Sequence, residues 1–389
     1  MTSTQTILKG GLASAALLAA VSAQGVTLGT INNTTVKMGG YVKLDAMWSD
    51  FSDGTVSGSS FGRDFYVPSV TPVGGTSENT VFDMHARQTR INFSTETTMG
   101  EHKLKSFIEV DFMVLDPANS DERISNSYSP RMRHAFLSYD NWLFGQTWTT
   151  FMNVGALPES VDFIGNTDGT IFVRQPQVRY TRNNWMFSLE NPETTVSTSA
   201  GRVIADDNEW PDFVARYNYN NKDLSLVFAG LLRQLTYNDG GAINDTEVGW
   251  GLSLTGKYVF GNKDDVRFGV NGGGGMGRYI ALNVANGAIV DGNNQLEAID
   301  SLAFFGSWRH LWNQKWRSNF IFSRIDIDNN VSLSGNSATK ATQSARANLM
   351  FDWAKNLTLG GELAFANREL ESGTDGDMTR LQFMAMYKF

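Results

Sequence analysis

Arginine is the residue type with the clearest chemical potential in this sequence. Guanidinium groups recur in short stretches where apolar and polar residues alternate, and they fall among the polar residues. These arginines are Arg87 (or Arg90), Arg131, Arg133, Arg179, Arg216, Arg346 and Arg380. Fixed charges of one sign in a narrow passage of low dielectric constant select ions by charge. Carboxylates share the same faces, so the alternative is that the charges pair with each other and only stiffen a wall.

Other residue types offer little catalytic or metal-binding chemistry. The four histidines (His85, His102, His134 and His310) are scattered, and no Gly-x-Ser-x-Gly or His-x-x-Glu-His motif accompanies them. A nucleophile needs a base and an orienting partner, so an enzyme is the weaker alternative. Cysteine is absent, which excludes disulfides and thiolate metal sites. Acidic loop pieces at 238–240 and 291–294 could bind Ca²⁺, but plain turns explain them better, and no cofactor or metal is expected.

The elements that carry the arginines must be β-strands, because hydrophobicity repeats every two residues from about Thr35 onward. The last segment is the clearest example: Leu381, Phe383, Ala385, Tyr387 and Phe389 alternate with polar residues and methionines. No segment after the N-terminus is long and apolar enough for a transmembrane helix. A strand in a membrane barrel, by contrast, needs an apolar residue only at every second position.

The connections between these strands alternate between short turns and long polar loops, such as Ala281–Asn294. Short turns on one side and long loops on the other are typical of a transmembrane antiparallel β-barrel. Tryptophan and tyrosine near the predicted strand ends, including Trp148, fit the two aromatic girdles of such a barrel. The sequence therefore predicts an all-β fold, a barrel of about 16 strands over residues 35–389, with short periplasmic turns and long extracellular loops.

The third long loop, about residues 149–170, is more apolar than the others and carries three acids, Glu159, Asp162 and Asp168. A loop in water rarely needs side chains such as Phe151, Leu157, Val161, Phe163 and Ile164. We expect this loop to fold back into the barrel, where it would place the acids in the pore and set the size limit of the passage. Contact with another subunit on the outside is the alternative.

Both ends of the chain indicate export to the outer membrane of a bacterium. Lys9, an apolar run over 10–20 and the small residues Val21-Ser22-Ala23 predict a signal peptide over residues 1–23, cleaved after about Ala23. A buried N-terminal helix is the alternative. Residues 24–34 would form a short periplasmic segment. The amphipathic last strand, which ends on Phe389, is typical of the signal that the outer-membrane assembly machinery reads.

The remaining features bear on partners and function. A net charge of −8 argues against nucleic acid. The interior of a sixteen-stranded barrel is too wide for side chains to fill, which favours a water-filled diffusion channel for small polar solutes in contact with outer-membrane lipid. A structural or adhesive barrel with a plugged lumen is the main alternative. An energy-coupled receptor is disfavoured, because a plug domain has no room before Thr35.

Several segments together resemble the DcaP-like family of trimeric outer-membrane porins. They are Gly145–Trp148, Phe151–Met152, Leu157–Glu159, Phe172–Thr181, Gly39–Asp45 and Met384–Phe389. The Arg-Gln-Pro-Gln motif at 174–177 is the most specific of these. The resemblance implies a homotrimer and passive uptake of small solutes, with a leaning towards anions such as dicarboxylates.

The resemblance also implies a lumenal role for Arg174 and Arg179 and a constriction role for Glu159 and Asp162. The sequence departs from the family at one point. Some members carry a periplasmic coiled coil before the barrel, but here only about ten residues precede the first strand and they show no heptads. We therefore expect no periplasmic stalk.

Overall fold

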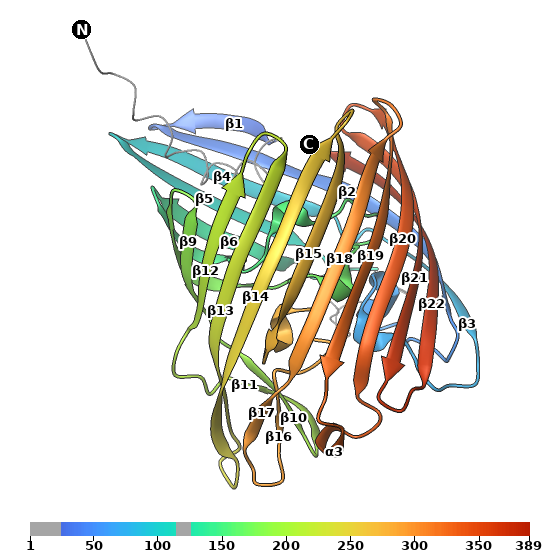
Figure 1. The fold of residues 1–389 in the computed structure, drawn as a ribbon. Helices are drawn as coiled ribbons and strands as arrows, with labels where there is room; N and C mark the ends of the chain where they lie inside the picture. The colour runs from blue at the N-terminus through green and yellow to red at the C-terminus, as the bar shows by residue number, and fades with distance from the viewer. Residues whose placement is uncertain (1–24, 114–125) are drawn as a thin grey trace.

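The computed structural model describes residues 25–113 and 126–389, and these form a closed antiparallel barrel of 16 strands (Figure 1). The predicted signal peptide lies outside the described residues. The wall strands are β2 (Thr34–Phe51), β3 and β4 (Asn79–His85 and Arg90–Met99, which make one wall strand), β5 (His102–Asp111), β6 (Arg131–Tyr139), β7 (Trp142–Trp148), β8 (Arg174–Arg182), β9 (Trp185–Glu190), β12 (Asp212–Asn220), β13 (Leu224–Asn238), β14 (Asn244–Phe260), β15 (Asp264–Gly274), β18 (Asp300–Leu311), β19 (Trp316–Asp328), β20 (Thr339–Ala354), β21 (Leu357–Leu370) and β22 (Asp375–Lys388). The barrel and its predicted strand count are confirmed.

The barrel closes where β22 pairs with β2. At the short-turn end of this seam, the backbone N–H groups of Gly40 and Phe389 each donate to the other residue's carbonyl oxygen, at N···O distances of 3.2 and 3.1 Å. The earlier part of β2, which β22 does not reach, pairs instead with β1 (Val26–Ile31). The described part of the segment expected to precede the barrel, residues 24–34, thus contributes a strand, β1, that continues the seam.

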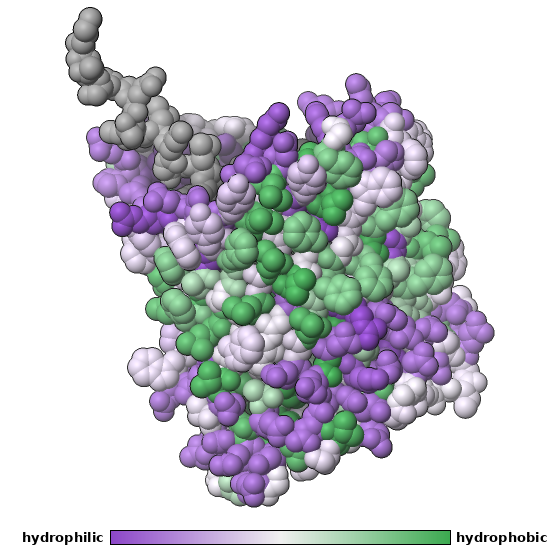
Figure 2. Space-filling model, viewed as in Figure 1, coloured by the Kyte–Doolittle hydropathy of each residue, from purple (hydrophilic) through white to green (hydrophobic). Residues whose placement is uncertain are grey.

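The two faces of the wall differ as the alternation predicts. In β22 the side chains of Leu381 and Phe383 are exposed on the outside, whereas those of Arg380 and Gln382 are buried inside. Hydrophobic residues gather in a band across the middle of the outer surface, with hydrophilic residues at both ends (Figure 2). This outer band is the surface that a lipid bilayer covers in a transmembrane barrel.

Aromatic side chains cluster at the short turns. Trp142, Trp185, Tyr258 and Trp316 are exposed on the outer face within a few residues of a turn, where amphipathic rings meet the polar headgroup region. Trp148 is an exception to the predicted girdles: its side chain is only 8% exposed and lies inside the barrel. It ends β7 where the chain turns inward.

The long connections contain short elements. They are α2 (Phe61–Asp64), η1 (Pro68–Val70), η2 (Val154–Ala156), η3 (Thr167–Gly169), η4 (Gly277–Tyr279), α3 (Val331–Ser334) and the strands β10 (Thr194–Thr198), β11 (Gly201–Ala205), β16 (Ala288–Val290) and β17 (Leu296–Ala298). The last four pair in the order β11-β10-β16-β17 and form a small sheet at the long-loop end (Figure 1). None of the described helices is long and apolar enough to cross a membrane.

Candidate functional site

The connection between β7 and β8, residues 149–173, runs along the inside of the barrel, and we call it the inner loop. It touches wall strands that are far apart around the circumference. Asn153 donates from Nδ2 to Thr255 Oγ1 of β14 at 3.0 Å, and Ser160 donates from Oγ to Glu362 Oε2 of β21 at 2.8 Å. Asn271 of β15 donates to the carbonyl oxygen of Gly169 at 2.8 Å. The inner loop therefore crosses the interior and is fixed at several points.

Two acids of the inner loop are anchors. Asp162 accepts a hydrogen bond from the backbone N–H of Tyr66 at 3.1 Å and lies 3.4 Å from Arg346 Nη1. Asp168 accepts from the hydroxyls of Tyr66 at 2.7 Å and Ser323 at 2.8 Å. Both side chains are buried, and a buried carboxylate is tolerated only with such partners. Contrary to expectation, neither acid presents a free charge to the passage.

The side chain of Glu159 is more exposed than those of Asp162 and Asp168. Its carboxylate forms a two-pronged pair with Arg317 of β19, at 2.6 and 2.7 Å, and its side chain remains 30% exposed. Arg317 also contacts Asp352 at 2.8 Å. Of the three acids predicted for the constriction, Glu159 alone keeps an exposed carboxylate, and that carboxylate is neutralised by a neighbour.

Six of the predicted selectivity arginines are buried and therefore do not line the water path as expected. They are Arg87, Arg133, Arg179, Arg216, Arg346 and Arg380. Arg179 donates from Nη2 to the carbonyl oxygen of Trp148, and Arg216 donates from Nη1 to that of Met152, both at 2.6 Å. Arg346 and Arg380 face Asp162. Most of these guanidiniums thus hold the inner loop in place, because their charge must be compensated once buried.

Three partly exposed arginines and the buried Arg133 form one group on the wall made by β4, β5, β6 and β8. We call Arg90, Arg131, Arg133 and Arg174 the arginine cluster. Asp111 is 2.8 Å from both Arg131 Nη2 and Arg133 Nη1. Glu109 is 2.7 Å from Arg133 Nε and 3.9 Å from Arg90 Nη1. Among the described residues, four cations thus face two carboxylates, which leaves an excess of positive charge.

Three members of the arginine cluster reach water: Arg90, Arg131 and Arg174 are partly exposed. The guanidinium of Arg174 lies over the Trp148 ring, 4.4 Å from its centroid. Its Nη1 is buried and has no hydrogen-bond partner among the described residues. The ring of Phe163, from the inner loop, faces the cluster at 5.7–5.9 Å from the guanidinium carbons of Arg90, Arg131 and Arg133. This side of the lumen combines positive charge with aromatic surface.

Part of the lumen is filled by an apolar core that the sequence did not predict. Residues 275–299, between β15 and β18, fold inward, and Met276, Tyr279 and Ile280 pack with Phe151 of the inner loop. Ile171 and Ile280 form a β-bridge between the two loops. The sequence predicted only a long polar loop at Ala281–Asn294. The signal that could have found the inward fold is the apolar trio at 276, 279 and 280 directly after glycines 272–275.

A second cationic group was also not predicted from the sequence. Asp265 of β15 is 2.7 Å from both Arg267 Nε and Arg309 Nη2 and 3.8 Å from Lys257 Nζ. Arg267 also donates to the carbonyl oxygen of Leu157 in the inner loop. Three cations around one carboxylate leave positive charge near the short-turn end of the lumen. Within residues 25–113 and 126–389, no group of histidines and acids could hold a metal ion.

Comparisons with known proteins place this geometry in context. The sequence model described as "DcaP outer membrane protein" matches residues 17–389. The crystal structure of the outer membrane channel DcaP of Acinetobacter baumannii has a TM-score of 0.78 at 24% identity, over 94% of this chain and 100% of that chain. The sequence matches none of the curated proteins.

Two further solved structures share the fold at lower similarity. The OmpT outer membrane protein of Vibrio cholerae has a TM-score of 0.57 at 10% identity, over 94% of this chain and 100% of that chain. An anion-selective porin from Comamonas acidovorans has a TM-score of 0.55 at 10% identity, over 92% of this chain and 100% of that chain. At these identities the likeness concerns the barrel alone.

Proposed function

The chain belongs to the DcaP outer membrane protein family and forms an outer-membrane porin channel, and from this premise we propose that it passes small polar solutes with a preference for anions such as dicarboxylates. The observation that carries the proposal is the arginine cluster. In the described part of the chain it has four guanidiniums against two carboxylates, and three of these arginines are partly exposed. An excess of fixed positive charge in a narrow pore attracts anions and repels cations.

The shape of the lumen supports the same proposal. The inner loop and residues 275–299 share an apolar core that fills part of the lumen, and in this proposal water and solutes pass beside that core along the arginine cluster. A dianion passing there could exchange its hydration shell for guanidinium N–H donors of the partly exposed Arg131 and Arg174. In this proposal the inner loop sets the size limit, Arg90, Arg131 and Arg174 contact the solute, and the buried arginines position the loop.

A planar-bilayer measurement tests the anion preference. Under a KCl gradient, the reversal potential of the wild-type channel should indicate anion selectivity, and R131E combined with R174E should move it towards cation selectivity. Arg182→Glu is the control, because Arg182 is exposed on the outer face of β8 and an Arg→Glu substitution there leaves the lumen unaltered. A cation-selective wild-type channel, or equal shifts in both variants, would remove the cluster from the selectivity mechanism.

The apolar core also supports a second candidate, a structural barrel whose lumen is closed. The core joins buried residues of both inward-folded loops to buried residues of β12, β13, β18 and β19. The bilayer experiment separates the two functions, since a closed barrel is electrically silent with wild-type protein at any salt gradient. An enzymatic function has no such observation behind it.

The export and assembly steps are part of the same proposal. Residues 1–23 act as a signal peptide cleaved after about Ala23, and the assembly machinery reads the strand that ends on Phe389. The mature chain assembles as a homotrimer in contact with outer-membrane lipid. Support for a trimer comes from a trimer form of Vibrio cholerae OmpT that shares the fold. N-terminal sequencing of the mature protein and its mass in detergent test both points.

A further inference from the structure

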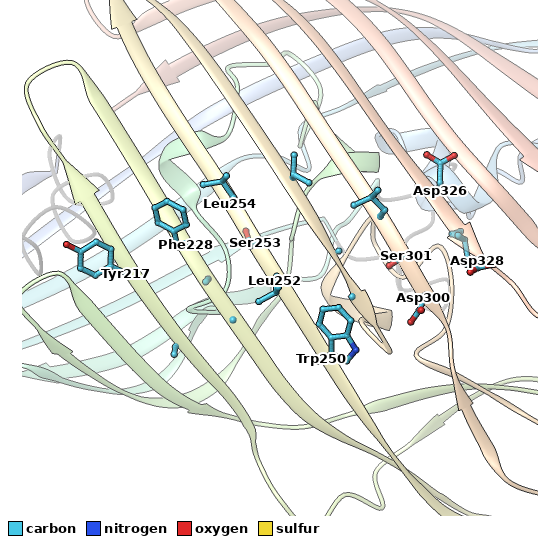
Figure 3. Close-up of a pocket in the computed structure, with 18 of the residues that line it drawn as sticks. Tyr217, Phe228, Trp250, Leu252, Ser253, Leu254, Asp300, Ser301, Asp326 and Asp328 are labelled. Carbon is cyan, nitrogen blue, oxygen red and sulfur yellow. The ribbon is translucent and has the colours of Figure 1, made fainter.

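The outer wall has a groove that the pore does not use. The groove has a volume of about 1160 Å³ and lies on the outer face of the strands from β12 to β19 (Figure 3). Small residues make its floor: Ala215, Gly230 and Gly272 point outward on β12, β13 and β15. Large apolar side chains, including Phe228 and Trp250, stand beside them (Figure 3).

The strand register shows the course of the groove. Ala215 pairs with Gly230, Gly230 with Leu252, Leu252 with Gly272, Gly272 with Leu302, and Leu302 with Asp326. Five inter-strand steps of about 4.8 Å give a length of roughly 24 Å. Because the strands of such barrels tilt by roughly 35–45°, this line runs obliquely and spans roughly 15 Å of membrane depth. That is about half of the ~30 Å hydrocarbon layer, or one leaflet.

The ends of the groove differ in depth and in polarity. Ala215 lies within β12. Asp300, by contrast, is the first residue of β18 and Asp328 is the last residue of β19, and both lie at the long-loop side. Asp300 and Asp328 are directly opposite each other across β18 and β19, and like charges in that position repel. Asp326 adjoins them and pairs with Arg324. No ion pair involves Asp300 or Asp328 among the described residues, so the polar end of the groove has an excess of negative charge.

We propose that the groove holds one acyl chain of a phosphorylated glycolipid of the outer leaflet, with divalent cations bridging its phosphates to Asp300 and Asp328. The apolar floor continues the lipid-facing band (Figure 2), and its oblique length matches one leaflet. Two carboxylates alone are too few oxygen ligands for Mg²⁺ or Ca²⁺, and no larger metal-binding group exists in the described ranges. The cation therefore binds only together with the lipid phosphate, which supplies the missing oxygens.

Two variants and a matched control test the proposal on the full-length protein. Gly230→Leu fills the floor, where a new Cβ would meet nothing closer than the Leu252 side chain at 3.9 Å. Gly306→Leu is the control, since Gly306 lies on the outer face of β18, outside the groove, and a Cβ there meets nothing within 4 Å. D300N combined with D328N removes the polar end. The probe is lipid A with Mg²⁺, and native mass spectrometry measures the fraction of protein that retains one lipid.

Wild type and G306L should retain the lipid equally, and G230L should retain about tenfold less, because roughly two methylenes of the chain lose their place. Chelation with EDTA should lower retention by wild type and leave the D300N/D328N variant unchanged. Equal retention by G230L and wild type would overturn the groove as the binding site. A change of oligomeric mass in G230L alone would overturn it in favour of a second copy of the chain. Equal, EDTA-insensitive retention of an ethanolamine phospholipid would overturn the headgroup assignment.

Discussion

The guanidinium of Arg174 lies 4.4 Å from the centroid of the Trp148 ring, and the two residues stand at the two ends of the inner loop. Trp148 ends β7, Arg174 begins β8, and the two are paired in the sheet. The stacked ring fixes the position of the guanidinium, while the Nη1 atom of Arg174 has no hydrogen-bond partner within the part of the chain that the structure describes. The start and the end of the inner loop thus meet at the residue that we expect to contact solute.

Removing the charge of Arg174 should weaken anion preference. A unit positive charge about 7 Å from a permeating ion in water stabilises an anion and destabilises a cation by about 0.6 kcal/mol each, which changes the anion-to-cation permeability ratio by roughly sevenfold. We expect Arg174→Gln to lower the anion-to-cation permeability ratio by that factor, as measured from reversal potentials in KCl gradients. Arg182→Gln on the outer face is the control. An unchanged ratio in R174Q would show that this guanidinium lies outside the ion path.

Removing the charge of Asp162 should loosen the inner loop. Asp162 faces Arg346 and Arg380, and all three side chains are buried, so Asp162→Asn leaves guanidiniums without their counter-charge. Breaking a buried pair in this way destabilises a fold by about 3–5 kcal/mol. We expect a lower melting temperature by circular dichroism together with larger or noisier single-channel currents. Asp375→Asn, at an exposed strand end, should change neither quantity, and a D162N channel indistinguishable from wild type would argue against the anchor.

Glu159 should act in the opposite direction from Arg174. Its side chain is 30% exposed and pairs with Arg317, and partly exposed pairs of this kind contribute only about 1 kcal/mol or less to stability. Glu159→Gln should therefore fold normally, leave Arg317 less compensated and raise the anion-to-cation permeability ratio. The same bilayer recordings measure it. An unchanged ratio would mean that the carboxylate does not influence the passing ion.

The barrel seam offers a test of folding. Gly40 has a φ of +149°, and a Cβ at this position would lie 2.2 Å from the carbonyl oxygen of Arg90. Gly40→Ala should therefore force the β2–β4 pairing apart, at a cost of about 1–3 kcal/mol or more. We expect a reduced yield of the folded, heat-modifiable band on gels after refolding. Gly306→Ala, where a Cβ meets nothing within 4 Å, should refold like wild type.

The wall could be predicted from sequence, whereas the contents of the lumen largely could not. The period-two pattern assigns Leu381 and Arg380 to opposite faces without knowledge of any partner. An arginine on the inner face, however, has the same pattern whether it meets water or a loop. Arg131 and Arg346 both follow the alternation, yet Arg131 is partly exposed and Arg346 is covered by the inner loop. Which inner-face residue a loop covers depends on contacts between distant segments.

The loop at 275–299 shows the same limit. Its inward fold depends on Phe151 and Ile171, which precede it by more than a hundred residues, and on a glycine run that lets the backbone pass close to the wall. Gly275 has a φ of +71°, and a Cβ there would lie 2.6 Å from Leu235. Periodicity reports the neighbours of a residue within its own strand, and it carries no information about such a long-range partner.

The shared core of the two inward-folded loops constrains how this barrel can diversify. The Ile171–Ile280 bridge and the packing of Phe151 against Tyr279 join the loops into one body. A substitution in one loop therefore changes the packing of the other. Homologous barrels with a different solute range should therefore show compensating changes at these paired positions. A graft intended to alter the solute range of another barrel would have to transfer both loops together.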